Sequence, residues 1–174
     1  QFVATLSGSY EVDVSLFGSS MVGAPFAVQV VPSTLAVQNS VITRYPPHAI
    51  AGSRALLSIS ARDTFGNRLS AADMKFELSA ANPAVPLPGP TSVSQIYVGS
   101  GEYNIVFVAT VAGVYTMVLK LPAGVIQPPF QTVVSPTLAS ERFTQNLTAL
   151  ARSVIAGHST TWRVLSRDSY DNAH

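Results

Sequence analysis

Cysteine is absent from the 174 residues, and charged side chains are scarce. The absence of cysteine excludes disulfides and thiolate metal sites, and it favours an intracellular protein. Charged residues make up 11% of the chain, against roughly 25% in an average soluble domain. The ten basic and nine acidic residues give a net charge of +1 and lie singly along the chain. We therefore expect no binding surface for nucleic acid or anionic lipid.

Apolar runs long enough to span a bilayer are also missing. The uncharged run from Ile105 to Leu119 has 15 residues, whereas a helix needs about 20 to cross a membrane. The sequence repeats with a period of 105 residues, as shown below, and the segment that corresponds to this run in the first copy contains Glu11 and Asp13. We expect no membrane insertion within this segment.

Motifs of catalysis and cofactor binding are missing too. The sequence contains neither a Gly-x-Ser-x-Gly elbow nor a phosphate-binding glycine loop. His48 and His158 are interpreted as solvated loop residues, and no acid/base pair stands out among the nine carboxylates. We expect no catalytic, cofactor-binding or metal-binding residues, and therefore no enzyme.

Several motifs occur twice, 105 residues apart. Ala51-Gly52 followed by Asp63-Thr64-Phe65-Gly66-Asn67 recurs as Ala156-Gly157 followed by Asp168-Ser169-Tyr170-Asp171-Asn172. Phe2-Val3-Ala4-Thr5 likewise recurs as Phe107-Val108-Ala109-Thr110. A period of this size fits one β-sandwich domain per copy. We expect residues 1–33 to be the closing part of one repeat, 34–136 a complete repeat, and 137–174 the opening part of a third.

Short stretches of alternating apolar and polar residues dominate the complete repeat. Each is bounded by Gly, Pro or Asn, which is typical of strands and turns. Seven strands in about 100 residues are typical of an immunoglobulin-like sandwich. By the repeat, the segment from Ser140 to Leu150 corresponds to an opening strand and not to a helix. The expected strands are 37–43, 55–61, 74–78, 92–97, 103–107, 115–121 and 130–134.

Two motifs carry a resemblance to a known family. Gly8-Ser9-Tyr10 followed by Gly23-Ala24-Pro25-Phe26, and Gly113-Val114-Tyr115 followed by Pro128-Pro129-Phe130, resemble the closing motif of filamin (ABP280)-type immunoglobulin-like repeats. Pro128 departs from the Gly-Ser of that motif. The resemblance implies an all-β chain of tandem immunoglobulin-like β-sandwich repeats, one complete and two partial.

The same resemblance implies a structural and protein-interaction role. Filamin-type repeats act as spacers and docking surfaces, and their partners add a β-strand to the exposed edge of the third strand, beside the fourth. We therefore expect other proteins and adjacent repeats of the same chain as partners. The residues expected at this docking edge are Lys75, Phe76, Glu77, Ser92, Val93 and Ser94.

Three settings agree with such repeats. The first is a larger cytoplasmic, cytoskeletal or ciliary protein. The Ala-rich, Arg-over-Lys composition fits an algal protein, and the resemblance implies an algal axonemal protein such as an outer-arm dynein heavy chain tail. The second is an extracellular cell-adhesion ectodomain, for which Asn146 in Asn146-Leu147-Thr148 would be a glycosylation site. The third is a scaffold for an enzyme or motor whose active part lies elsewhere.

Asp63 and Asn67, with their copies Asp168 and Asn172, allow two interpretations. The residues suit a tight turn, in which Asp bonds the backbone two residues on. They could instead be calcium ligands, but calcium takes six to eight oxygens and one turn supplies two or three. We favour the turn. The linkers Val30–Ala36 and Val134–Ala139 are expected to couple the repeats stiffly, with one residue fewer in the second.

Overall fold

The computed structural model describes residues 2–70, 74–81, 92–121, 124–126, 129–146, 156–157, 159, 161 and 163–174. Over these residues the backbone forms β-strands and one short 3₁₀ helix. No helix among them is long and apolar enough to cross a membrane. The predicted all-β class is confirmed.

One layer of the central unit is a four-stranded antiparallel sheet in the order β5-β7-β10-β9. Its inner strand β10 pairs along its whole length with both β7 and β9. The strand β9 is last in this order, and its outer edge therefore belongs to the rim of the sandwich. The strands are β5 (Val41–Arg44), β7 (Arg54–Ser60), β9 (Ser92–Gly99) and β10 (Glu102–Val108).

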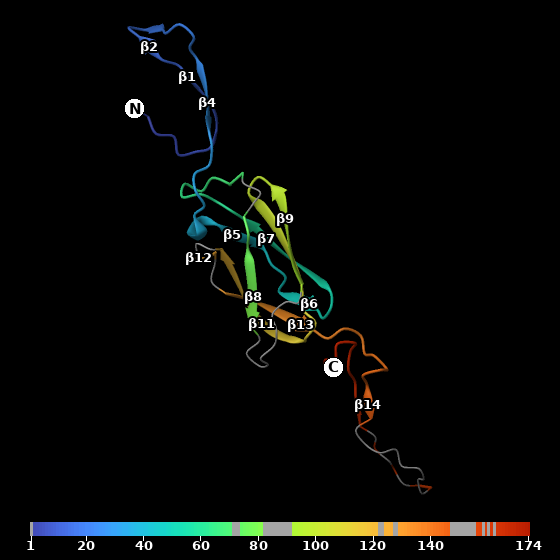
Figure 1. Ribbon diagram of the computed structural model, residues 1–174. Helices are drawn as coiled ribbons and strands as arrows, with labels where there is room; N and C mark the ends of the chain where they lie inside the picture. Colours follow the sequence, from blue (N-terminus) through green and yellow to red (C-terminus); the bar gives the residue numbers. More distant parts are fainter. Residues whose placement is uncertain are drawn as a thin grey trace.

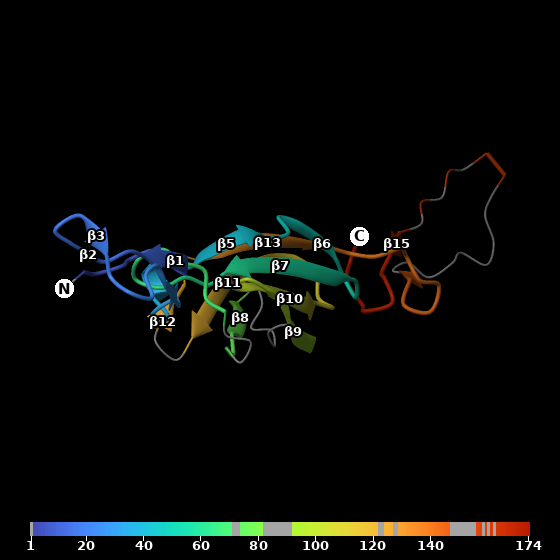
Figure 2. The ribbon, with the colours of Figure 1, turned by 90° about the horizontal axis from the view of Figure 1, so that it is seen from above.

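The other layer is built around β11, which pairs antiparallel with β8, β12 and β13. The strand β13 also pairs in parallel with β6. Figure 2 shows β8 and β9, which belong to different sheets, on the same side of the sandwich. The strands are β6 (His48–Ile50), β8 (Glu77–Ala81), β11 (Gly113–Leu121), β12 (Gly124–Val125) and β13 (Phe130–Ser135).

The core lies between the two layers and follows the alternation of the strands. Leu57 and Ile59 of β7 are fully buried, as the sequence pattern predicts. Every second residue of β10 and β11 is buried as well, because successive side chains of a strand point to opposite faces. The largest of these core side chains are Tyr103, Ile105, Phe107, Tyr115, Met117 and Leu119.

A hairpin of β1 (Gly8–Val12) and β4 (Phe26–Val30) lies at one end of the sandwich (Figure 1). It matches β11 and β13 in register, because Gly8 faces Val30 as Gly113 faces Val134. Tyr10 is 38% exposed whereas its counterpart Tyr115 is 3% exposed, since a second sheet covers only the latter. The tip of the β1–β4 hairpin carries the short strands β2 (Ser15–Leu16) and β3 (Ser19–Ser20).

At the other end, β14 (Gln145–Asn146) pairs with β15 (Val164–Leu165). Gln145 faces Leu165 as Val41 faces Ser60 in the central unit. Of the segment expected to be an opening strand, residues 145–146 are strand, whereas residues 141–143 form a turn closed on the Ser140 carbonyl. The sequence repeat is also a repeat of strand pairing.

Three details differ from the sequence-based expectations. The opening strand begins at Val41, because Val37–Asn39 form the 3₁₀ helix η1, closed by the Ser40 amide and hydroxyl on the Ala36 carbonyl. The third strand begins at Glu77, three residues later than expected. The short strands β6 and β12 were not expected.

The linkers are equal in length, which corrects the expected difference of one residue. Ala36 donates its backbone N–H to the Arg62 carbonyl, and its structural counterpart Ser140 donates to that of Arg167. Val30 to Ala36 thus corresponds to Val134 to Ser140. The missing residue lies in the hairpin before the second linker, because Phe26 pairs with Val12 as Phe130 pairs with Met117.

Candidate functional site

The turn 63–67 that follows β7 is organised by the Asp63 side chain. Its carboxylate accepts hydrogen bonds from the backbone N–H groups of Phe65 (2.9 Å) and Asn67 (2.8 Å). Gly66 has φ +84°, a left-handed conformation that glycine adopts without strain. The turn interpretation is confirmed. We call residues 63–67, and their copy 168–172, the junction turns.

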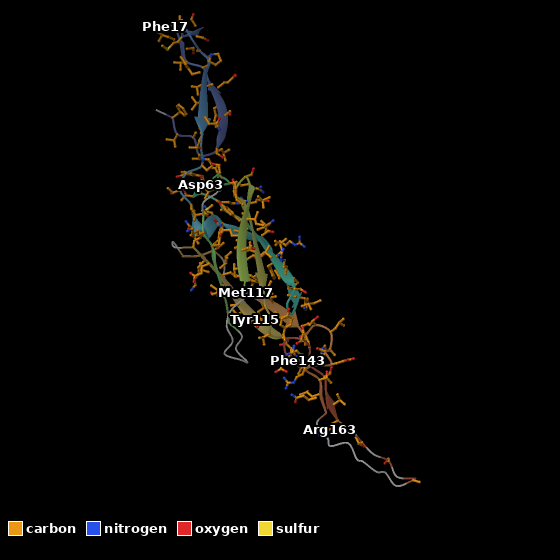
Figure 3. All side chains as sticks on the ribbon, turned by 45° about the vertical axis from the view of Figure 1, so that its right-hand side comes forward. Phe17, Asp63, Tyr115, Met117, Phe143 and Arg163 are labelled. Atoms are coloured by element: carbon orange, nitrogen blue, oxygen red, sulfur yellow. The ribbon has the colours of Figure 1, made fainter. Side chains whose placement is uncertain are left out.

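The Asp63 carboxylate also reaches across to the linker. It accepts a hydrogen bond from the Ser33 backbone N–H at 2.8 Å and one from the Asn67 side-chain amide at 2.9 Å. Figure 3 shows Asp63 where the β1–β4 hairpin meets the sandwich. With four N–H donors on its two oxygens, this carboxylate is engaged as a structural acceptor, and its calcium interpretation is not supported.

Burial of the Asp63 carboxyl would by itself raise its pKa. The hydrogen bonds from Asn67, Ser33 and Phe65 outweigh burial and lower the pKa from 3.8 to about 2. The pKa of Asp168 is lowered by the same balance, in which bonds from Asn172, Thr137 and Tyr170 oppose burial. Both groups are therefore held as carboxylates. Among the described residues, no group of three or more His, Asp or Glu side chains could hold a metal ion.

Asn67 joins this turn to the preceding repeat. Its side-chain oxygen accepts a hydrogen bond from the Ser7 backbone N–H at 2.9 Å, and its side-chain nitrogen donates to the Thr5 carbonyl at 2.8 Å. One carboxamide thus satisfies an acceptor and a donor that are two residues apart on the loop before β1. We call residues 5–7, and their copy 110–112, the junction loops.

The second junction has the same bonds between the corresponding residues. The Asn172 amide accepts from the Ala112 N–H at 2.7 Å and donates to the Thr110 carbonyl at 2.9 Å. Asp168 accepts from the Thr137 N–H of the second linker at 3.0 Å. The two junctions therefore use one arrangement of Asp, Asn and linker.

Each junction loop is also held from its own repeat by a tyrosine. The Tyr10 hydroxyl donates to the Leu6 carbonyl at 2.9 Å, and the Tyr115 hydroxyl donates to the Val111 carbonyl at 2.8 Å. Tyr115 buries its ring and uses its hydroxyl to bond a backbone carbonyl. Each loop is thus held by its own repeat through the tyrosine and by the next repeat through the asparagine.

An aromatic side chain completes the second junction. Tyr170 lies directly over Gly52, so closely that a Cβ at that glycine would overlap the ring and hydroxyl of the tyrosine. Gly52 also has φ +77° and donates its N–H to the Ala109 carbonyl at 2.8 Å. The Ala-Gly motif therefore supplies a flat contact surface for the following repeat.

The expected docking edge lies at β8 and β9, on the rim where the two sheets meet (Figure 2). Lys75 and Glu77 are exposed and Phe76 is half-buried against the core, as the alternation predicts. Val93 is 44% exposed and Ser94 is exposed; Ser92 opens β9. An open depression beside β8 is lined by Lys75, Phe76, Glu77, Lys120 and Leu121.

Gln95 of β9 was not expected at this edge. Its side-chain oxygen accepts a hydrogen bond from the Phe76 backbone N–H at 3.0 Å, and its side-chain nitrogen donates to the Met74 carbonyl. Since successive side chains alternate, Val93 shares the face of Gln95 and Ser94 points to the other face. The sequence contains no signal for this contact, because 19 residues separate Gln95 from Phe76.

Asn146 is the last residue of β14, and the remainder of its sequon lies outside the described residues. Its backbone pairs with Val164. Glycosylation at Asn146 therefore remains a prediction.

No protein-family model matches the sequence, and no curated protein matches it. Solved structures do match. The Escherichia coli adhesin FdeC aligns with 95% of this chain at 19% identity and a TM-score of 0.68, and Yersinia pseudotuberculosis InvD aligns with 97% at 16% identity and a TM-score of 0.59. The Lin-41 filamin domain aligns with 59% at 19% identity and a TM-score of 0.50.

The chain spans about half of the FdeC and InvD chains, 52% of each, and 98% of the Lin-41 domain. At these identities the likeness concerns the fold. The chain has the immunoglobulin-like β-sandwich fold of the Lin-41 filamin domain and of FdeC.

Proposed function

We propose that the chain is a non-catalytic spacer in which consecutive β-sandwich repeats are held at a fixed orientation. The units are residues 1–33, 34–136 and 137–174, the first and third corresponding to parts of a repeat. Each junction turn contacts the linker at that junction and the junction loop of the unit before it. Adjacent repeats of the same chain are thus the first partners of each unit.

The observation that carries this proposal is the identity of the two junctions. Hydrogen bonds of 2.7–2.9 Å join Asn67 to residues 5 and 7, and Asn172 to residues 110 and 112. The two linkers have the same length, and at each junction the aspartate carboxylate accepts a hydrogen bond from the corresponding linker N–H, that of Ser33 or Thr137. A flexible tether would need no such bonds, because a Gly/Ser linker leaves its domains free to reorient.

The experiment measures the distance across the first junction. Because the chain has no cysteine, cysteines placed at the exposed Glu11 and Thr43 can carry two spin labels. We expect one narrow distance distribution in the parent and a clearly broader one in Asn67→Ala. Asn104→Ala, which removes a hydrogen bond to Ser58 between β10 and β7 on the outer face of the sheet, is the matched control and should leave the distribution narrow.

A distribution that is already broad in the parent would contradict the proposal. So would an Asn67→Ala variant with the parent's width, since the junction bonds would then contribute nothing to orientation.

We also propose that other proteins dock on the chain by β-strand addition at the edge of β8. Lys75, Phe76 and Glu77 would contribute backbone groups and flanking charges, and Ser92, Val93 and Ser94 the neighbouring rim. The observation that favours this role is the Gln95 amide, which already bonds the backbone of residues 74 and 76. A peptide group of a docking partner has the same C=O acceptor and N–H donor as this side-chain amide, and could form the same two hydrogen bonds.

The setting of the array has three candidates: a cytoplasmic, cytoskeletal or ciliary protein, a cell-surface adhesin, or the scaffold of an enzyme or motor. The alignment over 95% of the chain with the bacterial adhesin FdeC favours the cell surface. The algal axonemal setting has support from the sequence resemblance alone. A glycan on Asn146 of the native protein, detected by mass spectrometry, would contradict the cytoskeletal and ciliary settings.

A further inference from the structure

We propose that Gln95 blocks the docking edge and that an extended peptide binds there only by displacing it. This inference rests on the proposed docking function. The two hydrogen bonds from the Gln95 carboxamide to the Met74 carbonyl and the Phe76 N–H are called the Gln95 bridge. They use an acceptor and a donor that an added strand would need.

The geometry of the bridge is that of backbone pairing. In extended chain, the N–H and C=O groups of alternate residues point to the same edge. Met74 and Phe76 are alternate residues just before β8, and the Gln95 amide bonds the carbonyl of one and the N–H of the other. The amide therefore occupies the place that a residue of an added strand would occupy.

The junctions provide an internal comparison. Asn67 and Asn172 bond the carbonyl of one residue and the N–H of the residue two positions later in the same way. Asn172 is only 7% exposed, and this carboxamide is therefore closed off from competing groups. Gln95 lies exposed on the rim, where a peptide can reach the same backbone groups.

The occupant is therefore an extended peptide segment recognised through its backbone. The same edge continues past Phe76 to the alternate residues Leu78 and Ala80 of β8. A peptide that pairs with this stretch replaces the two bonds of Gln95 by a longer series.

The first measurement tests the bridge itself. Hydrogen exchange of the Phe76 amide should be slow in the parent and about tenfold faster or more in Gln95→Ala, because one N–H loses its acceptor. Gln131→Ala, which removes another exposed glutamine on a strand, should leave this rate unchanged. Equal exchange rates in the parent and Gln95→Ala would overturn the inference.

The second measurement tests the blocking of docking. The probe is a capped octapeptide of alternating Thr and Val, titrated into each variant. We expect Gln95→Ala to bind it about tenfold more tightly than the parent and Gln131→Ala do, the factor expected from releasing one or two net hydrogen bonds. The same peptide N-methylated at alternate residues, which removes the N–H groups of one edge, should not bind.

Two outcomes would separate this inference from the docking proposal. If the parent and Gln95→Ala bind the probe equally and N-methylation abolishes binding, the edge docks peptides but Gln95 does not block it. If no variant binds the probe although Phe76 exchange rises in Gln95→Ala, the docking edge itself is contradicted, and the inference with it. Equal melting temperatures of the variants would exclude misfolding as the cause.

Discussion

At the scale of residues, a few polar side chains carry most of the specific geometry. Asp63, Asn67 and their copies are short side chains with two polar atoms each, and every one of these atoms has a partner. Burial of such polar groups costs free energy unless they are hydrogen-bonded. Their pairing explains how Asp63 and Asp168 can both be fully buried.

The depressed pKa of Asp63 predicts a loss of stability in acid. A carboxyl whose folded-state pKa is lowered stabilises the folded protein above its unfolded pKa, and that stabilisation is lost as the pH falls through the folded pKa. With values of 3.8 and about 2, the loss from Asp63 lies between about pH 4 and pH 2. Urea unfolding of the parent and Asp63→Asn across this window measures it.

The two unfolding free energies should converge as the pH falls, since protonation removes the charge that Asn lacks. A constant difference between the parent and Asp63→Asn from pH 7 to pH 2 would contradict the assignment.

The contact between Gly52 and Tyr170 predicts a junction-specific effect of one methyl group. Gly52→Ala and Gly66→Ala both place a side chain at positive φ, at a cost of about 1 kcal/mol. Only Gly52→Ala also displaces Tyr170, because nothing lies within 4 Å of a Cβ at Gly66. We expect the Ala112 amide, which bonds Asn172, to exchange faster in Gly52→Ala and at the parent rate in Gly66→Ala.

Equal Ala112 exchange in Gly52→Ala and the parent would mean that Tyr170 does not support the second junction.

At the scale of elements, the strands could be predicted and their ends could not. Alternation in β7, β10 and β11 identifies both the strands and their buried faces, since burial of every second residue is what the pattern encodes. The start of β5 depends on the Ser40 hydroxyl closing a 3₁₀ turn on Ala36. Such a local bond competes with the strand and has no periodicity that would reveal it.

The equivalent strands β1 and β11 predict unequal effects of one substitution. Tyr115 is only 3% exposed, and its hydroxyl donates to the Val111 carbonyl. Tyr115→Phe removes this hydrogen bond and should lower the free energy of unfolding by about 1 kcal/mol. Tyr10→Phe removes the same bond where water can replace it, and should cost much less. Urea unfolding of both variants measures the difference, and equal costs would contradict it.

At the scale of the whole molecule, the 105-residue period predicts how the chain divides into units, and the β-sandwich fold expected for such units is confirmed. The contacts between units were not. Asn67 bonds residues 60 and 62 positions earlier, and no single-sequence pattern links positions so far apart. The motif around Asp63 indicated a turn, but only the folded arrangement brings its Asn onto the preceding repeat. The Gln95 bridge was missed for the same reason.

The junction loops also determine how such a chain loses its structure. Each loop belongs to one unit, and the amide that holds it belongs to the next. Melting either unit therefore withdraws two hydrogen bonds from its neighbour, and the stability of a unit contains a nearest-neighbour contribution. Heating an array of these units would open it in contiguous stretches that spread from the ends, where a unit has a neighbour on one side only.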